Sequence, residues 1–71
     1  MKTTEDCIRI AAAGGGMDLS GAGKTTEDLI RIASAVRKGG GTIYIPGSKT
    51  TEDVIRICSA APGKVIVRWH D

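Results

Sequence analysis

One nine-residue stretch occurs three times in this chain of 71 residues. It reads KTTEDCIRI from Lys2, KTTEDLIRI from Lys24 and KTTEDVIRI from Lys49, and the copies differ only at the sixth position, which is always apolar. Self-similarity at a regular spacing is typical of arrays in which each unit packs against the next. The sequence therefore predicts a single repeat domain at 1–71, with units at 2–23, 24–48 and 49–71.

Each copy of the nonapeptide predicts the start of a helix. Its first threonine (Thr3, Thr25 or Thr50) is expected to be the N-cap, and the aspartate three residues later is expected to form a capping box with it. The four-residue spacing of Glu and Arg predicts ion pairs along each helix, namely Glu5–Arg9, Glu27–Arg31 and Glu52–Arg56. Helix formation thus accounts for these polar residues without a catalytic role.

The residues after the nonapeptide continue an amphipathic helix and then end it. In the second copy one face is apolar and is expected to be buried, with Leu29, Ile32, Ala33 and Val36. Glycine runs or a Pro-Gly pair follow at 14–16, 39–41 and 62–63, and such residues commonly end helices.

Short strands are predicted after these breaks, at 17–20, 42–45 and 64–69, because apolar and polar residues alternate there. The alternation places one apolar set on a common face: Met17, Leu19, Ile43, Ile45, Val65, Val67 and Trp69. Right-handed crossovers between sequential parallel strands put every helix on the same side of the sheet. The predicted fold class is α/β, in which three helix–strand repeats form a short two-layer arc with a three-stranded parallel sheet and helices on one side.

The repeat length and the helix–strand unit resemble leucine-rich repeats and related α/β solenoids in architecture. In that family's motif, L-x-x-L-x-L-x-x-N-x-L, the L-x-L part is matched by 17–19 and 43–45, whereas Ala22 and Ser48 stand at the Asn position. The resemblance implies an array whose sheet face can bind partners, and no binding residue is carried over from the family. The near-identity of the copies is typical of an engineered or consensus scaffold, or of recent duplication.

The segment SGAGKTT at 20–26 resembles the end of a Walker A loop, G-x-x-x-x-G-K-[ST], which holds phosphate at a helix N-terminus. Gly23, Lys24 and Thr25 match the motif, Gly21 adds a second loop glycine, and Asp18 stands where the motif has its first glycine. Because Lys-Thr-Thr recurs at 49–51 and 2–4, helix capping also explains it. Phosphate or nucleotide binding by Gly21, Gly23, Lys24 and Thr25 is therefore an alternative function.

No catalytic, cofactor or metal site is predicted. His70 is the only histidine, and a metal site usually needs three or four ligands. Cys7 and Cys58 occupy apolar helix positions, where small core thiols are expected. They lie on the first and third predicted helices, too far apart for a disulfide.

The predicted interaction surface lies at the sheet, with Tyr44, Ile66, Arg68, Trp69 and His70. Three units without polar capping repeats leave the sheet edges and both end helices open, which favours a homo-oligomer formed through sheet edges or exchanged helices. A possible protein partner on the strand face is the other expectation.

A net charge of +2, from ten basic and eight acidic side chains, indicates neither a nucleic-acid nor a membrane partner. With no long apolar run and no signal-peptide pattern, a cytoplasmic location is expected. The predicted function is a non-catalytic structural or interaction repeat protein that self-associates. The alternatives are the phosphate binder and a protein-binding fragment of a larger solenoid.

Overall fold

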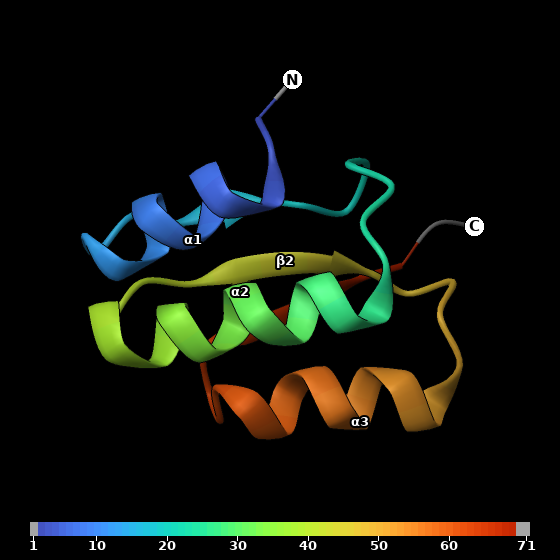
Figure 1. The fold of residues 1–71 in the computed structure, drawn as a ribbon. Helices are drawn as coiled ribbons and strands as arrows, with labels where there is room; N and C mark the ends of the chain where they lie inside the picture. Colours follow the sequence, from blue (N-terminus) through green and yellow to red (C-terminus); the bar gives the residue numbers. More distant parts are fainter. Residues whose placement is uncertain (1, 70–71) are drawn as a thin grey trace.

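The computed structural model describes residues 2–69, which form three helix–strand units in chain order (Figure 1). The helices are α1 (Thr4–Ala12), α2 (Thr26–Gly39) and α3 (Thr51–Ala60), and the strands are β1 (Met17–Asp18), β2 (Ile43–Pro46) and β3 (Val65–Arg68). The strands pair in parallel in the order β1-β2-β3, and α2 lies between α1 and α3 in a helical layer. The fold class expected from the sequence is thus confirmed.

The register of the sheet aligns equivalent positions of the three units. Met17 is opposite Ile43, which in turn is opposite Val65. The next row runs from Asp18 through Tyr44 to Ile66. Each unit therefore repeats the position of its neighbour across the sheet as well as along the helical layer.

The three helices begin where the nonapeptide predicts. Thr3, Thr25 and Thr50 are N-caps with extended backbones, and each hydroxyl accepts a hydrogen bond from the backbone N–H of the aspartate three residues later, at 3.1–3.2 Å. In α1 the Asp6 carboxylate also accepts from the backbone N–H of Thr3 at 3.3 Å, which completes the capping box. These contacts satisfy N–H groups that a helix leaves without a partner in its first turn.

The core is centred on the middle unit. Its largest fully buried side chains are Leu29, Ile32, Ile43, Ile45, Ile57 and Val36. Most of these belong to α2 and β2, which have a neighbouring unit on both sides, and the predicted apolar stripe of α2 is buried throughout. In β3, Val65 and Val67 are only half-buried because they have a neighbouring strand on one side alone.

β1 and β3 are shorter than the sequence predicts, whereas β2 keeps the predicted length and is shifted by one residue from 42–45. β1 covers only the first half of 17–20, because the Asp18 carboxylate accepts hydrogen bonds from the backbone N–H and the hydroxyl of Ser20 and so turns the chain. β3 ends at Arg68, so Trp69 lies outside the strand, and the expectation that it continues the apolar face of Val65 and Val67 was wrong: Trp69 is 74% exposed. Its ring lies beside Gly47, where an added Cβ would come within 2.7 Å of the ring atom Cε3.

A glycine at the end of α2 sets how closely α1 and α2 approach. A Cβ added at Gly39 would lie 1.9 Å from the carbonyl oxygen of Ala11. The adjoining Gly40 has a φ of 87° and ends α2 in the left-handed conformation, with its N–H donating to the carbonyl oxygen of Val36 at 2.8 Å. The glycine run at 39–41 is therefore a packing feature as well as a helix stop.

We predict that Gly39→Ala destabilises the protein by about 2–3 kcal/mol, because the new methyl group overpacks the α1–α2 contact. Chemical denaturation monitored by circular dichroism measures the change. The control is Gly21→Ala, since a Cβ at Gly21 meets no atom within 4 Å; its effect is expected to stay within about 0.5 kcal/mol. Equal effects of the two substitutions would contradict the packing role of Gly39.

Candidate functional site: the contacts between repeats

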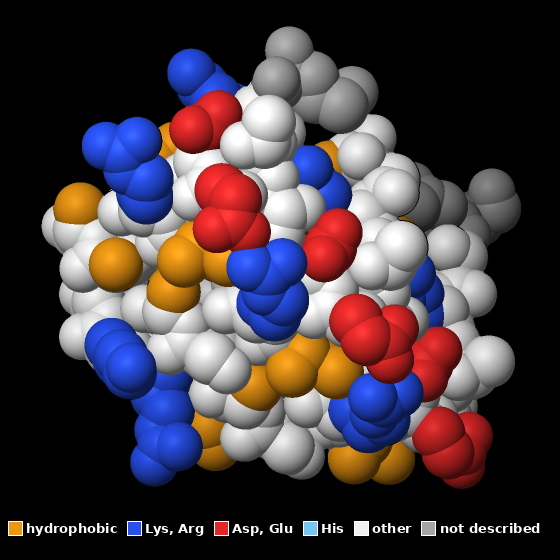
Figure 2. All heavy atoms as spheres, viewed as in Figure 1, with side chains coloured by type: hydrophobic (Ala, Val, Ile, Leu, Met, Phe, Trp, Pro, Cys, Tyr) orange, Lys and Arg blue, Asp and Glu red, His pale blue; other side chains and the backbone are white. Residues whose placement is uncertain are grey.

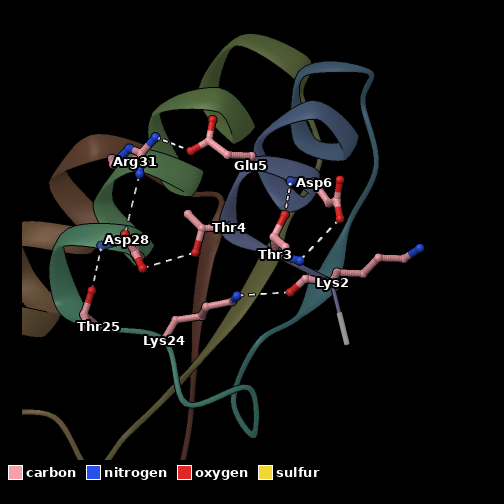
Figure 3. Close-up of polar contacts among 9 residues, drawn as sticks. All are labelled: Lys2, Thr3, Thr4, Glu5, Asp6, Lys24, Thr25, Asp28 and Arg31. Atoms are coloured by element: carbon pink, nitrogen blue, oxygen red, sulfur yellow. Dashed lines mark hydrogen bonds and ion pairs between the residues drawn. The ribbon is translucent and has the colours of Figure 1, made fainter.

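The second threonine of the nonapeptide joins one unit to the next. The hydroxyl of Thr4 donates to Asp28 Oδ2 at 3.1 Å (Figure 3). The hydroxyl of Thr26 donates in the same way to Asp53 Oδ2 at 3.2 Å. Asp28 and Asp53 also donate their backbone N–H groups to the N-cap threonines of their own helices. The same aspartate therefore takes part in capping one helix and binding its neighbour.

The Glu–Arg pairs also run between helices. Arg31 pairs with Glu5, and Arg56 Nη2 lies 3.2 Å from Glu27 Oε2. Each arginine has a second carboxylate partner three residues earlier in its own helix, Asp28 for Arg31 and Asp53 for Arg56. Figure 2 shows the result as acidic and basic side chains that alternate across the helical layer.

The ion pairs expected along each helix from the four-residue spacing were wrong. Within residues 2–69, none of the ion pairs joins Glu5 to Arg9, Glu27 to Arg31, or Glu52 to Arg56. The physical reason is that the helices lie side by side, so that a glutamate reaches the arginine of the following unit. The sequence reasoning missed these cross-helix partners. The only signal for them in the sequence was the identity of the three copies, which indicated that the units contact one another.

The candidate phosphate loop is occupied by contacts within the chain. The ammonium group of Lys24 donates to the carbonyl oxygen of Lys2 at 3.1 Å (Figure 3), and the Thr25 hydroxyl caps α2. Gly21 and Gly23 lie in the loop before this cap, and Gly23 has a φ of +68°. The Asp28 carboxylate stands in the same helical turn and opposes an anion there. Phosphate binding stays a prediction that these contacts do not favour.

The predicted interaction surface forms a row across the sheet. The guanidinium of Arg68 lies 4.8 Å from the centroid of the Tyr44 ring, and Arg68 Nη2 lies 3.4 Å from Asp18 Oδ2. Ile66 lies opposite Tyr44 in the sheet and is 43% exposed. Trp69 follows β3 directly and is exposed beside Gly47. His70, the fifth predicted member, lies outside the described residues. Asp18 is the member that sequence reasoning left out.

The two ends of the helical layer expose side chains whose counterparts are covered. Ile10 on α1 is 37% exposed, whereas its counterparts Ile32 and Ile57 are fully buried. Ile55 on α3 is 56% exposed, whereas its counterparts Ile8 and Ile30 are half-buried. The position of Ile10 is covered by the preceding helix, which α1 lacks within residues 2–69. The position of Ile55 is covered by the following helix, which α3 lacks there.

The remaining chemistry-bearing side chains form no cluster in the described part of the chain. Cys7 is buried on α1, Cys58 is half-buried on α3, and both are free thiols. Residues 2–69 contain no group of three His, Cys, Asp or Glu side chains placed to hold a metal ion. Among the helices that the structure describes, none has the length and apolarity that crossing a membrane requires.

Comparison of the chain with protein-family models, curated proteins and solved structures finds no match in any of the three.

We predict that Glu27 and Arg56 are energetically coupled, by about 0.2–1 kcal/mol, because the pair is direct but mostly exposed. A double-mutant cycle with Glu27→Gln and Arg56→Gln, measured by chemical denaturation, gives the coupling, which should weaken as salt is added. The control cycle combines Glu27→Gln with Arg31→Gln and should show no coupling. A larger coupling within α2 than between α2 and α3 would contradict the cross-helix pairing.

We predict that α1 loses stability as the pH falls below about 3.8. The hydrogen bond from the backbone N–H of Thr3 holds the pKa of Asp6 below its ordinary value of 3.8, with the charges of Lys2 and Arg9 adding to the effect. A carboxyl whose pKa is lower in the folded state stabilises that state above the unfolded pKa, and this stabilisation disappears as the pH falls through the folded pKa.

An NMR titration of the Asp6 carboxyl and the Thr3 amide measures this pKa. Asp6→Asn removes the titrating group and is the control, since the Thr3 amide should then lose the corresponding inflection. A carboxyl pKa at or above 3.8 would contradict the capping-box assignment.

Proposed function

We propose that the chain is a non-catalytic structural and interaction module that associates with copies of itself. The observation that supports this best is the use of the nonapeptide's polar side chains. Thr4, Glu5 and Asp28 bind across the α1–α2 boundary, and their counterparts bind across the α2–α3 boundary. Side chains that would be the candidates for chemistry in the repeat are thus engaged in joining helices.

The edges of the sheet support the same proposal. Within residues 2–69, β1 and β3 are the outer strands and each has a strand neighbour on one side only. The backbone N–H and C=O groups on the outer side of an edge strand are a template for pairing with another chain. β3 is the stronger candidate because its apolar residues Val65 and Val67 are incompletely covered. The proposal includes the cytoplasm as the compartment, where thiols such as Cys7 and Cys58 stay reduced.

A second candidate function is binding of a different protein on the sheet face, as in a fragment of a larger solenoid. It is favoured by the Arg68–Tyr44 contact, by the exposed Ile66 opposite Tyr44 and by the exposed Trp69 that follows Arg68 in the chain. Aromatic and arginine side chains are enriched among the residues that dominate binding energy at protein interfaces. The phosphate alternative has less support, because Lys24 and Thr25 are already engaged.

We predict that the average mass measured by sedimentation velocity exceeds the 7.4 kDa of one chain and rises with concentration between about 1 and 100 μM. The rise is expected because the incompletely buried ends and edges become covered as copies associate. A control run at high dilution should return the monomer mass. A mass that stays at 7.4 kDa over the whole range would contradict self-association and leave the sheet-face partner as the better candidate.

A further inference from the structure

We propose that copies of the chain stack head to tail, with the outer side of α3 in one copy packed against the outer side of α1 in the next. The partner is therefore a second copy, bound through the contact that already joins α2 to α3. This inference rests on the self-association proposed above and specifies its geometry. It is supported by the complementarity of the outer side of α3 and the outer side of α1. The two sides match in their polar side chains, in their apolar side chains and in the register of the sheet.

The polar halves of the contact are complementary. On α1, Asp6 and Arg9 are the counterparts of Asp28 and Arg31, which bind Thr4 and Glu5 of the preceding unit. On α3, Thr51 is the counterpart of Thr4, which donates its hydroxyl, and Glu52 is the counterpart of Glu5, which accepts from the guanidinium. Within residues 2–69 neither Arg9 nor Glu52 forms an ion pair. In a stack Thr51 would donate to Asp6, and Glu52 would pair with Arg9, of the next copy.

The apolar halves match in the same way. A hollow of about 380 Å³ lies on the outer side of α1 and is lined by Lys2, Asp6, Arg9, Ile10 and Ala13. At the corresponding places on α2 and α3, Ile32 and Ile57 are fully buried. Ile8 lies on the side of α1 toward Ile32, and Ile30 lies on the side of α2 toward Ile57. Both Ile8 and Ile30 are half-buried. Their third counterpart, Ile55, is the exposed isoleucine of α3, and it is the side chain that we place in the hollow of the next copy.

The sheet continues in the same register. Met17, Ile43 and Val65 are already aligned across β1, β2 and β3. A copy stacked as described brings its β1 to the open edge of β3, so that Met17 of that copy lies opposite Val65. The half-buried Val65 and Val67 would gain a neighbouring strand on their open side, as Ile43 and Ile45 of β2 have on both sides.

This contact joins two different faces of the chain, so each copy retains one open face of each kind after binding. Such a heterologous contact grows into a ring or an open filament, whereas a contact between identical faces stops at a dimer. That difference makes the stack testable with variants in which only one face is blocked.

The test uses Ile55→Asp, which blocks the α3 face, and Ile10→Asp, which blocks the α1 face. Each variant alone is expected to be monomeric, with self-association weakened at least about tenfold by the loss of one apolar contact and the added charge. Mixed in equal amounts, the two should form a 1:1 complex and stop there, because each retains the face that the other has lost. Sedimentation velocity and native mass spectrometry measure the masses, and circular dichroism verifies folding.

A pair of charge variants covers the case in which Ile10→Asp fails to fold. Arg9→Glu and Glu52→Arg each place like charges opposite each other in the stack, so each alone should associate more weakly than the unmodified chain. The double variant Arg9→Glu/Glu52→Arg restores opposite charges and should regain association. The matched control is Ile66→Asp, at the exposed isoleucine of the sheet face, which should associate as the unmodified chain does.

The outcomes separate the stack from its alternatives. Association that persists in Ile10→Asp alone indicates a contact of α3 with α3, and association lost in Ile66→Asp indicates the sheet face. An unmodified chain that associates while the Ile55→Asp and Ile10→Asp mixture does not, with both variants folded, overturns the stack and leaves self-association standing. An unmodified chain that never associates overturns both.

Discussion

The hydrogen bond from the second threonine of one nonapeptide to the aspartate of the next is the contact on which the arrangement of the units depends. Thr4 and Asp28 both lie in the first turn of their helices, so the bond fixes the start of α2 relative to the start of α1. The same bond between Thr26 and Asp53 fixes α3 relative to α2. Because each strand follows its helix after a short break, aligned helix starts are consistent with the aligned register of the sheet. Local capping and long-range packing therefore share the same two aspartates, which cap through the backbone N–H and bind the neighbouring helix through Oδ2.

Position in the array, rather than residue type, decides how much each apolar side chain contributes to stability. Full burial of an isoleucine side chain is worth roughly 1.5–3 kcal/mol relative to exposure. Ile32 and Ile57 are buried completely, while Ile10 at the same place in the first copy is not. A chain this short buries a comparatively small share of its surface, so such differences weigh heavily. The outer units thus have apolar surface left over whose burial against another molecule would add to stability.

The sequence was sufficient for the features that depend on local signals. The threonine caps, the buried stripe of α2 and the alternation of Ile43 and Ile45 are each specified by residues a few positions apart, and so the order of elements and the α/β class followed. The ion pairs were not predictable in this way, because Arg31 pairs with Asp28 on its own helix and also with Glu5 on α1, and the second partner depends on the lateral placement of the helices. The role of Lys24 was obscured for the same reason: its loop matches a phosphate motif locally, whereas its partner Lys2 is distant in sequence. The sequence predicted that both end helices are open, but it did not single out Ile10 and Ile55 as the exposed side chains, because the same residue has different surroundings in each copy.

Because the three copies are nearly identical, the outer faces of α1 and α3 carry the same residues as the faces that pack inside the molecule. An array that ends within one molecule is expected to present polar residues on its terminal faces, since these are the faces that must stay in water. Here Ile10 and Ile55 remain at the two ends, and Arg9 and Glu52 carry opposite charges beside them. Each end face has an exposed isoleucine with a charged side chain beside it, and the two charges are of opposite sign. This composition is typical of an interface rather than of a terminal face. The proposed stack therefore uses, at the ends of the molecule, the same contact that joins the units in its interior.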